Sequence, residues 1–512
     1  MKNKEIIRKK GTGTIFYLIF WLLFEFALIL GYVAIWTNMT FHAELEEIFF
    51  TIRSPLDGAD GSYLSSALRF CVPRICLGTV LFTCLVIFCK KRNRISFSLD
   101  LHLGKHTLRI PGQKLLRSIV AFFSVAMLLA TGVYAQRAYN IIDYIKVNMS
   151  KTMVYENYYV DPDSVVISAT DSPKNLLCIY LESMEVTYAS REQGGQQDVN
   201  YIPNLTQMAF DNVSFGSGNG VLGGSYPLSK TAWTTAALLG TTSGVPFHFP
   251  LANNELVSYA SFASNLKTIG TVLEKKGYNQ EFICGSDASF GGRRAYFTQH
   301  GNYEIFDYYT AMDKGYIEPG YKVWWGFEDS YLFEIAKDEI QRLAALDAPF
   351  NLTMLTVDTH NISGYVCPLC DTEKYDDQLA VVLDCADHQV QHFIDWVKEQ
   401  DFYEDTAIVI LGDHPRIDED LVAGVPLVDR KVYNCFINSS VSPVLPTETR
   451  QVTQLDMFPT MLAAMGYEIE GDRLGLGTNL FSDLPTMVDI LGYETFNSEL
   501  CKQSNYYRDN FY

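Results

Sequence analysis

The sequence predicts an α/β protein in which N-terminal transmembrane helices precede a sandwich built around a mostly parallel central sheet. Two observations carry this prediction. Residues 14–36 and 118–135 are apolar runs long enough to cross a membrane. From about Asp171, short and nearly continuous apolar segments alternate with segments of helical period. Strands that are apolar on both faces and interleaved with helices are typical of a parallel sheet covered by helices.

The membrane anchor is expected over residues 1–136 and should contain about three transmembrane helices. The first apolar run is interrupted only by Glu25, which either faces another helix or a lipid headgroup, or is protonated or near the boundary. A middle run, 75–89, has 15 residues and is short for a span. Arg69 and Arg74 could extend it by reaching the membrane interface with their long side chains.

Basic residues predict the orientation of the anchor. Residues 1–13 carry five Lys or Arg, and residues 90–117 carry eight against one Asp, whereas the loop between the first two runs is acidic. The positive-inside rule places both basic stretches in the cytoplasm. We therefore expect a multi-pass protein of the cell membrane with a cytoplasmic N-terminus and an extracytoplasmic chain after residue 136. No small-residue cleavage site follows the first run, so an uncleaved anchor is favoured over a signal peptide.

Charge separates the anchor from the rest of the chain. Residues 1–136 have a net charge of +8, and the remaining 376 residues have a net charge of −27. Such an acidic domain repels nucleic acid, which excludes that class of partner, and the anchor must hold it near the membrane. Residues 137–170 contain five Tyr and show no clear period, so a juxtamembrane linker is expected there. The outer domain is expected over 171–512.

Strands and helices of the outer domain follow from the length and period of its apolar segments. Expected strands are 176–182, 280–285, 350–358, 406–413 and 433–439, and expected helices include 265–277, 328–345, 376–399 and 453–466.

Three of these strands end in side chains that can bind a metal or move a proton. They end at Glu182, at Asp358 with His360 two residues later, and at Asp413 followed by His414. Ligands of open α/β sheets bind at the carboxyl ends of the strands. A single acid after a strand is usually a turn or cap residue, but three such endings in one domain favour a functional site.

A second candidate feature is the segment SKTAWTTAALLGTTSGVP, residues 229–246, which predicts a helix that opens at a threonine. A threonine there has an ordinary explanation as an N-cap. The functional alternative is a nucleophilic hydroxyl beside a divalent cation, with the helix N–H groups binding a phosphate oxygen. On these residues alone, the N-cap explanation is favoured.

Five motifs in chain order resemble the phosphoglycerol transferase and lipoteichoic acid synthase family of the alkaline phosphatase superfamily. The motifs are LLCIYLESMEVTY, AWTTAALLGTTSGVP, WWGFEDSYLFEIA, TVDTHNISGY and LGDHP. The first, third and fourth are most similar to the branch that adds phosphoglycerol to periplasmic glucans. The resemblance covers about residues 170–485 and implies an alkaline-phosphatase-like, sulfatase-like α/β sandwich.

The resemblance also implies a single divalent metal and a threonine nucleophile. Carried over to this sequence, the metal ligands are Glu182, Thr234, Asp413 and His414. Oxygen ligands with one imidazole suit Mn²⁺, with Mg²⁺ as the alternative, better than a thiolate-rich site would. The metal role would explain why the strand of the LGDHP motif ends in an acid and an imidazole.

The assignment of the nucleophile within the implied site depends on family spacing. Thr234 lies twelve residues before Pro246, which is the spacing that the resemblance implies for the nucleophile, and Thr231 and Thr235 are the rivals.

For substrate binding, the resemblance implies a phosphate-binding arginine at Arg293, with Arg294 as the alternative, and a substrate-contacting histidine at His360. The family often has a tryptophan in the arginine loop, where this chain has Gly291. The shape of the glycerol pocket is therefore open at this point.

The resemblance implies an enzyme, a metal-dependent phosphoglycerol transferase. It would take glycerol phosphate from phosphatidylglycerol, form a phospho-threonine intermediate, and pass the group to a hydroxyl of a cell-envelope glycan or glycolipid. The alternatives are a phosphoethanolamine transferase, which adds more histidine ligands, and a catalytically inactive membrane binding protein. Sulfatase activity is disfavoured because the sequence has no Cys/Ser-x-Pro-x-Arg motif.

Three cysteines of the outer domain lie in polar surroundings: Cys367, Cys370 and Cys385. A disulfide persists outside the cell. The first two have redox-motif spacing but no thioredoxin-like setting, which favours a structural disulfide. Cys370 and Cys385 bracket a surface excursion and match a cysteine pair of the glucan-modifying branch, so they are expected to be bonded. His388 and His392 have the spacing of a metal pair, but we expect both in solvent beside the buried face of their helix.

Overall fold

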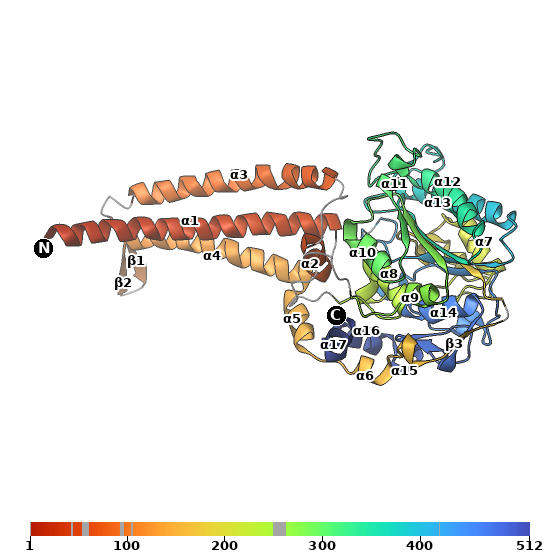
Figure 1. Ribbon diagram of the computed structural model, residues 1–512. Helices are drawn as coiled ribbons and strands as arrows, with labels where there is room; N and C mark the ends of the chain where they lie inside the picture. The colour runs from red at the N-terminus through yellow and green to blue at the C-terminus, as the bar shows by residue number, and fades with distance from the viewer. Residues whose placement is uncertain are drawn as a thin grey trace. The chain divides into compact units, whose positions relative to one another are not determined.

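The computed structural model describes residues 2–41, 45–53, 61–92, 97–103, 106–170, 172–248, 263–418 and 420–512. The chain forms two compact units (Figure 1). The first contains α1 (Lys2–Phe41), α3 (Gly61–Arg92), the hairpin of β1 (Ser98–Leu103) and β2 (His106–Pro111), and α4 (Gly112–Tyr139). The second contains α2 (Leu45–Arg53) from Glu46 on, and the chain from Lys146 on.

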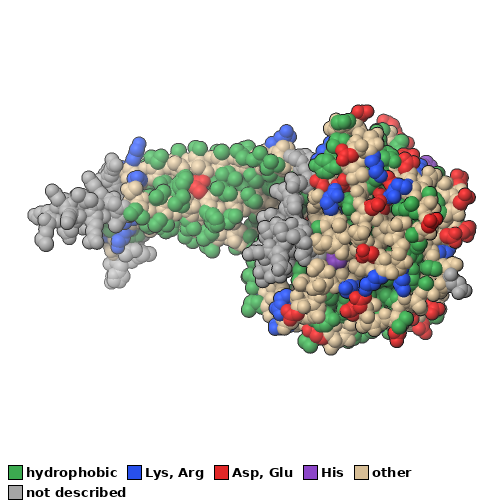
Figure 2. Space-filling model, in the orientation of Figure 1, with side chains coloured by type: hydrophobic (Ala, Val, Ile, Leu, Met, Phe, Trp, Pro, Cys, Tyr) green, Lys and Arg blue, Asp and Glu red, His purple; other side chains and the backbone are tan. Residues whose placement is uncertain are grey.

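Three helices of the first unit are long and apolar enough to cross a membrane, over Thr14–Phe41, Tyr63–Arg92 and Gly112–Tyr139. Figure 2 shows hydrophobic side chains over the visible face of these helices. The middle helix is longer than the 15-residue run expected from the sequence. It begins before that run, at Gly61, and includes Arg74. One guanidinium N–H of Arg74 donates to the Phe70 carbonyl, at 2.7 Å, so the charged group lies against the backbone of its own helix.

Polar contacts join the helices of the first unit. Glu25 of α1 is buried and accepts a hydrogen bond from the Thr79 hydroxyl of α3, at 2.5 Å. The hydroxyls of Ser124 and Thr131 on α4 donate to backbone carbonyls of α1, at 2.7 and 2.9 Å. Of the alternatives for Glu25, the structure shows the one in which it faces another helix. Polar groups buried between apolar helices need such partners, because lipid provides none.

The second unit is built on a six-stranded sheet of order β6-β5-β7-β4-β8-β9. Its strands are β4 (Asn175–Leu181), β5 (Asn279–Cys284), β6 (Glu304–Phe306), β7 (Phe350–Leu355), β8 (Thr406–Gly412) and β9 (Asn434–Ile437). All neighbours pair in parallel except β8 and β9, which are antiparallel. This arrangement confirms the predicted mostly parallel sheet, and five of its six strands overlap expected ones. The sixth, β6, has three residues and was not expected.

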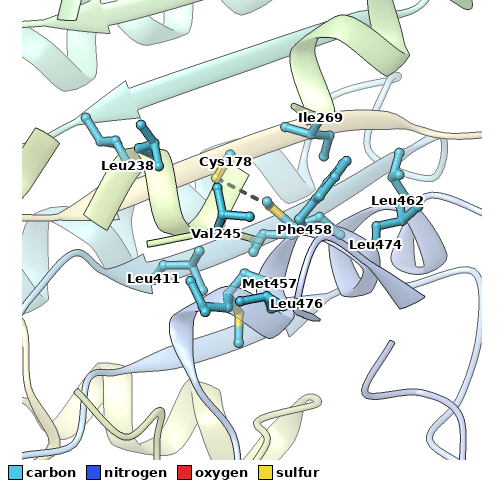
Figure 3. Packing of buried hydrophobic residues seen from close by; sticks show 14 of the residues in the cluster. Cys178, Leu238, Val245, Ile269, Leu411, Met457, Phe458, Leu462, Leu474 and Leu476 are labelled. Atoms are coloured by element: carbon cyan, nitrogen blue, oxygen red, sulfur yellow. Dashed lines mark hydrogen bonds between the residues drawn. The ribbon is translucent and has the colours of Figure 1, made fainter. Parts of the chain in front are cut away.

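Helices cover both faces of the sheet. They are α7 (Pro203–Asp211), α8 (Thr234–Ser243), α9 (Ile269–Lys275), α10 (Arg293–Gln299), α11 (Tyr308–Asp313), α12 (Asp329–Ala344), α13 (Gln378–Lys398), α14 (Met457–Ala464), α15 (Met487–Leu491), α16 (Tyr493–Cys501) and α17 (Asn505–Phe511). Successive residues of a strand face opposite sides of a sheet. Accordingly, Cys178 and Tyr180 of β4 pack in one core with α8, α9 and α14 (Figure 3), whereas Leu177 and Ile179 pack in the other with α7, α12 and α13.

Part of the predicted linker is ordered against the second unit. The linker contains α5 (Ile141–Met149), which crosses the boundary between the two units, and then α6 (Val154–Tyr158) and β3 (Ile167–Ala169) within the second unit. Strand β3 pairs with β10 (Tyr467–Ile469), and β11 (Arg473–Leu474) pairs with β12 (Gly477–Thr478). Tyr155 is buried, its hydroxyl lies 3.2 Å from His248 Nε2, and its ring contacts Tyr507 and Phe511. Because the apolar residues of this segment follow no clear helical or strand period, its packing could not be predicted from the sequence. The bounds 1–136, 137–170 and 171–512 remain predictions.

The predicted Cys370–Cys385 disulfide is wrong. All 11 cysteines lie within the described residues, and none of them forms a disulfide. The sulfur of Cys367 lies 3.6 Å from that of Cys370 and 3.7 Å from that of Cys385, so the three thiols form one cluster. Spacing along the chain could not show that Cys367 is also close to α13. His388 and His392 are exposed, as expected.

A fragment of residues 150–512 is expected to be more stable than one of residues 160–512. The shorter fragment lacks the buried side chains of Val154 and Tyr155, and burying such a side chain contributes about 1.5–3 kcal/mol. Thermal denaturation followed by circular dichroism compares the two midpoints. Tyr155→Ala in the longer fragment should reproduce much of the difference, and equal midpoints for all three proteins would refute the role of this segment in the core.

Candidate active site

The pairing of β4 with β8 brings two acidic residues together. In this parallel pair Leu181 is opposite Gly412, so the next residues, Glu182 and Asp413, leave the same edge of the sheet. Both acids are buried. One carboxylate oxygen of Asp413 accepts hydrogen bonds from the backbone N–H groups of Ser183 and His414, at 2.7 and 2.8 Å. The other oxygen is buried and accepts no hydrogen bond from the described residues.

The N-terminus of α8 places a hydroxyl beside these acids. Thr234 is the first residue of α8, and its Oγ1 lies 3.3 Å from Glu182 Oε2 and 3.3 Å from His414 Nε2. His414 Nδ1 is 2.9 Å from the Pro415 carbonyl, an acceptor, so Nδ1 carries the proton of the neutral ring. The lone pair of Nε2 therefore points to the hydroxyl and the acids, as in a metal-ligating imidazole.

Glu182, Asp413 and His414 fit a divalent metal. Their ligand atoms all lie within 4.8 Å of one another, and all three side chains are buried. Burying two carboxylates so close together is costly unless a cation or protons neutralise them. The unpartnered oxygen of Asp413 supplies a free acceptor to this group. Two carboxylates, an imidazole and an adjacent hydroxyl suit a cation that prefers oxygen and nitrogen ligands.

The protonation of these groups follows from their burial and mutual charge. Burial and the neighbouring Glu182 carboxylate raise the pKa of Asp413 to about 7. Burial would raise the pKa of Glu182 as well, but His360 and His414 outweigh it and lower that pKa. Burial opposes the charged form of His414, yet Asp413 and Glu182 raise its pKa overall. Protons on Asp413 and on His414 would therefore both compete with a cation near neutral pH.

The rival residues of the sequence analysis point elsewhere. The Thr235 hydroxyl donates to the Gly291 carbonyl, at 2.9 Å. The Thr231 hydroxyl lies 3.2 Å from the Leu228 carbonyl and also contacts the side-chain oxygen of Gln454. Of the three threonines, Thr234 is the one whose hydroxyl lies within hydrogen-bond distance of the acid pair. Arg294 forms an ion pair with Asp307.

Arg293 and His360 line the same pocket as Glu182 and Thr234. The guanidinium of Arg293 is buried and donates to the Ser286 hydroxyl and to the Asp287 carbonyl, each at 3.0 Å. These bonds fix the orientation of its planar fork, which is the geometry that suits phosphate oxygens.

One ring nitrogen of His360 is hydrogen-bonded to the backbone. Its Nδ1 is 2.8 Å from the Asn361 carbonyl, and burial lowers the pKa of the ring although Glu182 opposes this effect. A neutral ring with its proton on Nδ1 leaves Nε2 as a hydrogen-bond acceptor. His360 can therefore accept a hydrogen bond from a hydroxyl of a ligand.

The pocket has an aromatic wall that sequence reasoning missed. Gly291 has a φ of 64°, and a Cβ atom there would meet the Thr235 hydroxyl at 2.7 Å, so the position has no room for a side chain. Phe290 and Trp325 provide the aromatic surface instead, with ring centroids 5.2 Å apart. The Trp325 ring also lies 5.0 Å from that of His360. The WWGF motif contained this tryptophan, but nothing in the sequence placed it beside the arginine loop.

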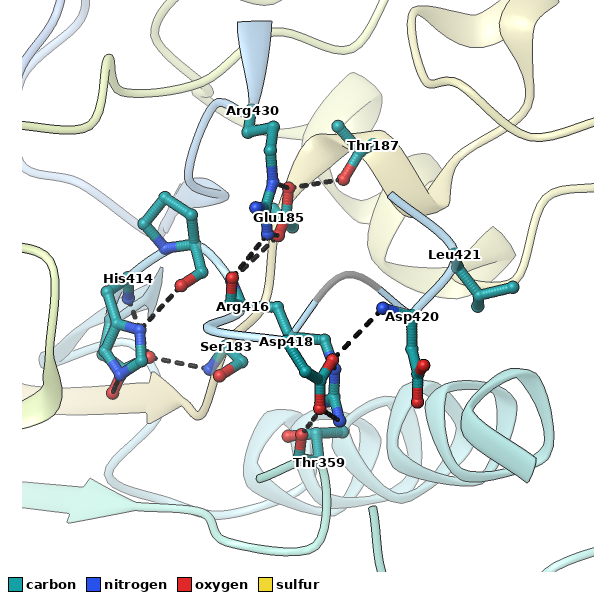
Figure 4. Close-up of polar contacts among 12 residues, drawn as sticks. Ser183, Glu185, Thr187, Thr359, His414, Arg416, Asp418, Asp420, Leu421 and Arg430 are labelled. Atoms are coloured by element: carbon teal, nitrogen blue, oxygen red, sulfur yellow. Dashed lines mark hydrogen bonds and ion pairs between the residues drawn. The ribbon is translucent and has the colours of Figure 1, made fainter. Parts of the chain in front are cut away.

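A buried ion-pair network supports the loop that follows β8 (Figure 4). Arg416 is fully buried, pairs with Asp418, and donates to the Thr359 carbonyl at 2.6 Å. Glu185 accepts from the backbone N–H of Arg416, at 2.9 Å, and from the guanidinium of Arg430. The network therefore ties the segment after β8 to those after β4 and β7. Proximity to LGDHP was the only sequence signal for Arg416.

Comparison with known proteins matches residues 174–467 to the family model described as Sulfatase. Phosphoglycerol transferase I of Xanthomonas axonopodis pv. citri (strain 306) is 28% identical over 319 residues, which are 61% of this chain and 43% of that protein. Phosphoglycerol transferase I of Escherichia coli (strain SMS-3-5 / SECEC) is 26% identical over 331 residues, 64% of this chain and 41% of that protein.

Among solved structures, a protein in the alkaline phosphatase superfamily from Vibrio parahaemolyticus is 21% identical. It has a TM-score of 0.48, over 67% of this chain and 78% of that chain. The chain spans less than half the length of the two curated relatives. The Sulfatase match covers more than half of the chain, and it contains Glu182, Thr234, Arg293, His360, Asp413 and His414. On this evidence the chain belongs to the Sulfatase family.

Proposed function

We propose that this protein is a metal-dependent phosphoglycerol transferase. It takes glycerol phosphate from phosphatidylglycerol and passes it to a hydroxyl of a cell-envelope glycan or glycolipid. The observation that carries the proposal is the position of the Thr234 hydroxyl, 3.3 Å from both Glu182 and His414 at the opening of a helix. The names of the curated relatives, at 26–28% identity, support the choice of transferred group.

The proposed placement of the enzyme brings it to its lipid donor. The three apolar helices anchor the chain in the cell membrane, with the N-terminus in the cytoplasm and the sheet-containing unit outside. The basic stretches at 1–13 and 90–117 support this orientation. A donor embedded in the membrane and an acceptor in the cell envelope are both accessible from that side.

In the first half of the reaction, Thr234 Oγ1 attacks the phosphorus of phosphatidylglycerol. Oγ1 loses its proton as it bonds phosphorus, the bond from phosphorus to the diacylglycerol oxygen breaks, and that oxygen takes up a proton as diacylglycerol leaves, so the protons balance. A divalent cation, Mn²⁺ or Mg²⁺, held by Glu182, Asp413, His414 and Thr234, would supply positive charge that lowers the pKa of the hydroxyl.

The remaining site residues bind the transferred group. Nη1 of Arg293, whose Nε and Nη2 groups are bonded to the protein, donates to a nonbridging phosphate oxygen, and His360 Nε2 accepts a hydrogen bond from a glycerol hydroxyl. Trp325 excludes water from one side of the pocket. In the second half of the reaction the acceptor hydroxyl loses its proton and attacks phosphorus, the bond from phosphorus to Thr234 Oγ1 breaks, and Oγ1 takes up a proton.

Incubating the full chain in detergent with fluorescent phosphatidylglycerol and Mn²⁺ tests the proposal. Labelled diacylglycerol should accumulate, and phosphatidylethanolamine should give none. Turnover of phosphatidylethanolamine alone would support the phosphoethanolamine transferase, and turnover of neither lipid would support the binding protein.

Thr234→Ala should reduce turnover at least about a thousandfold, because it removes the attacking oxygen. Thr235→Ser keeps the hydroxyl that bonds Gly291 and serves as the matched control, with turnover close to that of the parent. With donor present and no acceptor, peptide sequencing should locate the glycerophosphoryl mass on Thr234. Finding it on Thr235, or an active Thr234→Ala enzyme, would refute the assignment.

Mn²⁺ affinity should rise with pH up to about 7 and level off above it. Asp413 has a pKa of about 7 in the folded chain, so below that pH a proton must leave before it ligates. Affinity should fall by at least about tenfold for each pH unit below 7, because a proton on His414, whose pKa is also raised, competes as well, and isothermal titration calorimetry can measure this. The exposed His388→Ala variant should show the same profile, and Asp413→Asn should bind weakly throughout. A flat profile for the parent from about pH 5 to about pH 7 would contradict this.

A further inference from the structure

The three clustered thiols of Cys367, Cys370 and Cys385 lie outside the active site and take no part in the proposed reaction. Cys367 and Cys370 belong to the segment between β7 and α13, and Cys385 is on α13. Cys367 and Cys385 are buried, whereas Cys370 is partly exposed. Two thiols of the cluster are thus buried, and the third can be reached from solvent.

We propose that these three cysteines form a second metal site, which binds Zn²⁺ through three thiolates and leaves the fourth position to water. The proposal is independent of the transferase function. It rests on the separation of the sulfurs, on the local turn that carries two of them, and on a buried amide directed at the cluster.

The separations of the sulfurs fit tetrahedral zinc. Two thiolates that each lie about 2.3 Å from one Zn²⁺ at the tetrahedral angle are about 3.8 Å apart. The observed separations are 3.6 Å between Cys367 and Cys370 and 3.7 Å between Cys367 and Cys385. All three sulfurs lie within 4.8 Å of one another, so one ion can reach each of them with small side-chain adjustments. A disulfide would need two sulfurs only about 2.05 Å apart.

The turn of Cys367-Pro-Leu-Cys370 is suited to a metal ligand. The backbone N–H of Cys370 donates to the Cys367 carbonyl, at 3.1 Å, and closes the turn that brings the two side chains together. Two cysteines separated by two residues recur in zinc sites, where the pair supplies two adjacent corners of the tetrahedron. Cys385 then supplies the third corner from α13.

A buried amide provides the outer hydrogen bonds that thiolate ligands need. Gln389 lies one turn after Cys385 on α13, and its Nε2 is 3.4 Å from the Cys385 sulfur and 3.9 Å from that of Cys367. Its exposed fraction is 9%, and its Oε1 has no hydrogen-bond partner among the described residues. An amide N–H directed at two sulfurs stabilises negative charge on them, as expected around a thiolate–metal centre.

A metal ion at this site would cross-link the segment that carries His360 to α13. Cys367 follows His360 by seven residues, and Gly364 and Tyr365 between them are bonded back to His360 and Asp358. Zinc bound to Cys385 would add a cross-link from this segment to a long helix packed on the sheet. The site is therefore structural, and it positions the loop without touching a substrate.

Cobalt substitution of the full chain in detergent tests the proposal. The protein is purified under argon with reductant, stripped of metal, and titrated with Co²⁺. Three thiolate ligands should give an intense near-ultraviolet thiolate-to-Co²⁺ charge-transfer band at one equivalent, and Zn²⁺ should abolish it. The candidate active site has no sulfur among its metal ligands and cannot give this band, so the result is independent of transferase activity.

Matched variants assign the band to the cluster. Cys367→Ser and Cys385→Ser should lose it, together with one zinc per chain by elemental analysis, whereas Cys501→Ser, which removes a partly exposed thiol elsewhere, should keep both. Absence of the band in the parent chain, or its survival in both cluster variants, would overturn the proposal. So would peptide mapping of protein purified with Zn²⁺ and without reductant, if two of the three cysteines were joined by a disulfide and zinc were absent.

Discussion

The parallel register of β4 with β8 is the constraint on which the candidate active site depends. Because Leu181 is opposite Gly412, the chain leaves both strands at the same edge and buries Glu182 next to Asp413. A shift of one residue would turn either acid to the other face of the sheet. The register is held by the apolar strand residues that pack into the two cores. Packing far from the chemistry therefore determines the distance between the two acids.

Placing like charges at a buried edge has an energetic cost that the surrounding structure offsets in two ways. Backbone N–H groups satisfy one oxygen of Asp413, while the other remains available to a cation. The second contribution is the network of Glu185, Arg416 and Arg430, in which buried charges are paired and bonded to backbone groups. Removing one partner of such a network leaves an uncompensated buried charge, which is strongly destabilising. The network thus couples the stability of the fold to the geometry of the site.

Sequence reasoning could identify Glu182 and Asp413 because apolar runs mark strands, and the carboxyl ends of parallel strands share an edge. It could not choose Thr234 from chemistry alone, since a threonine at a helix start is ordinary, and a family resemblance was needed. Trp325 and Arg416 were missed because their importance depends on which loops meet in space. The predicted disulfide failed for the same reason, since chain spacing does not show a third thiol nearby. Periodicity reports local structure, whereas contacts between distant loops follow from the completed fold.

Anomalous X-ray scattering from crystals grown with Mn²⁺ tests the central claim most directly. The claim is that the edge of β4 and β8 and the start of α8 together hold one metal against the Thr234 hydroxyl. It predicts one strong manganese peak within ligand distance of Glu182, Asp413, His414 and Thr234 Oγ1, with Thr235 still bonded to Gly291. A manganese ion bound elsewhere, or bound at this edge with Thr234 turned away, would contradict the account.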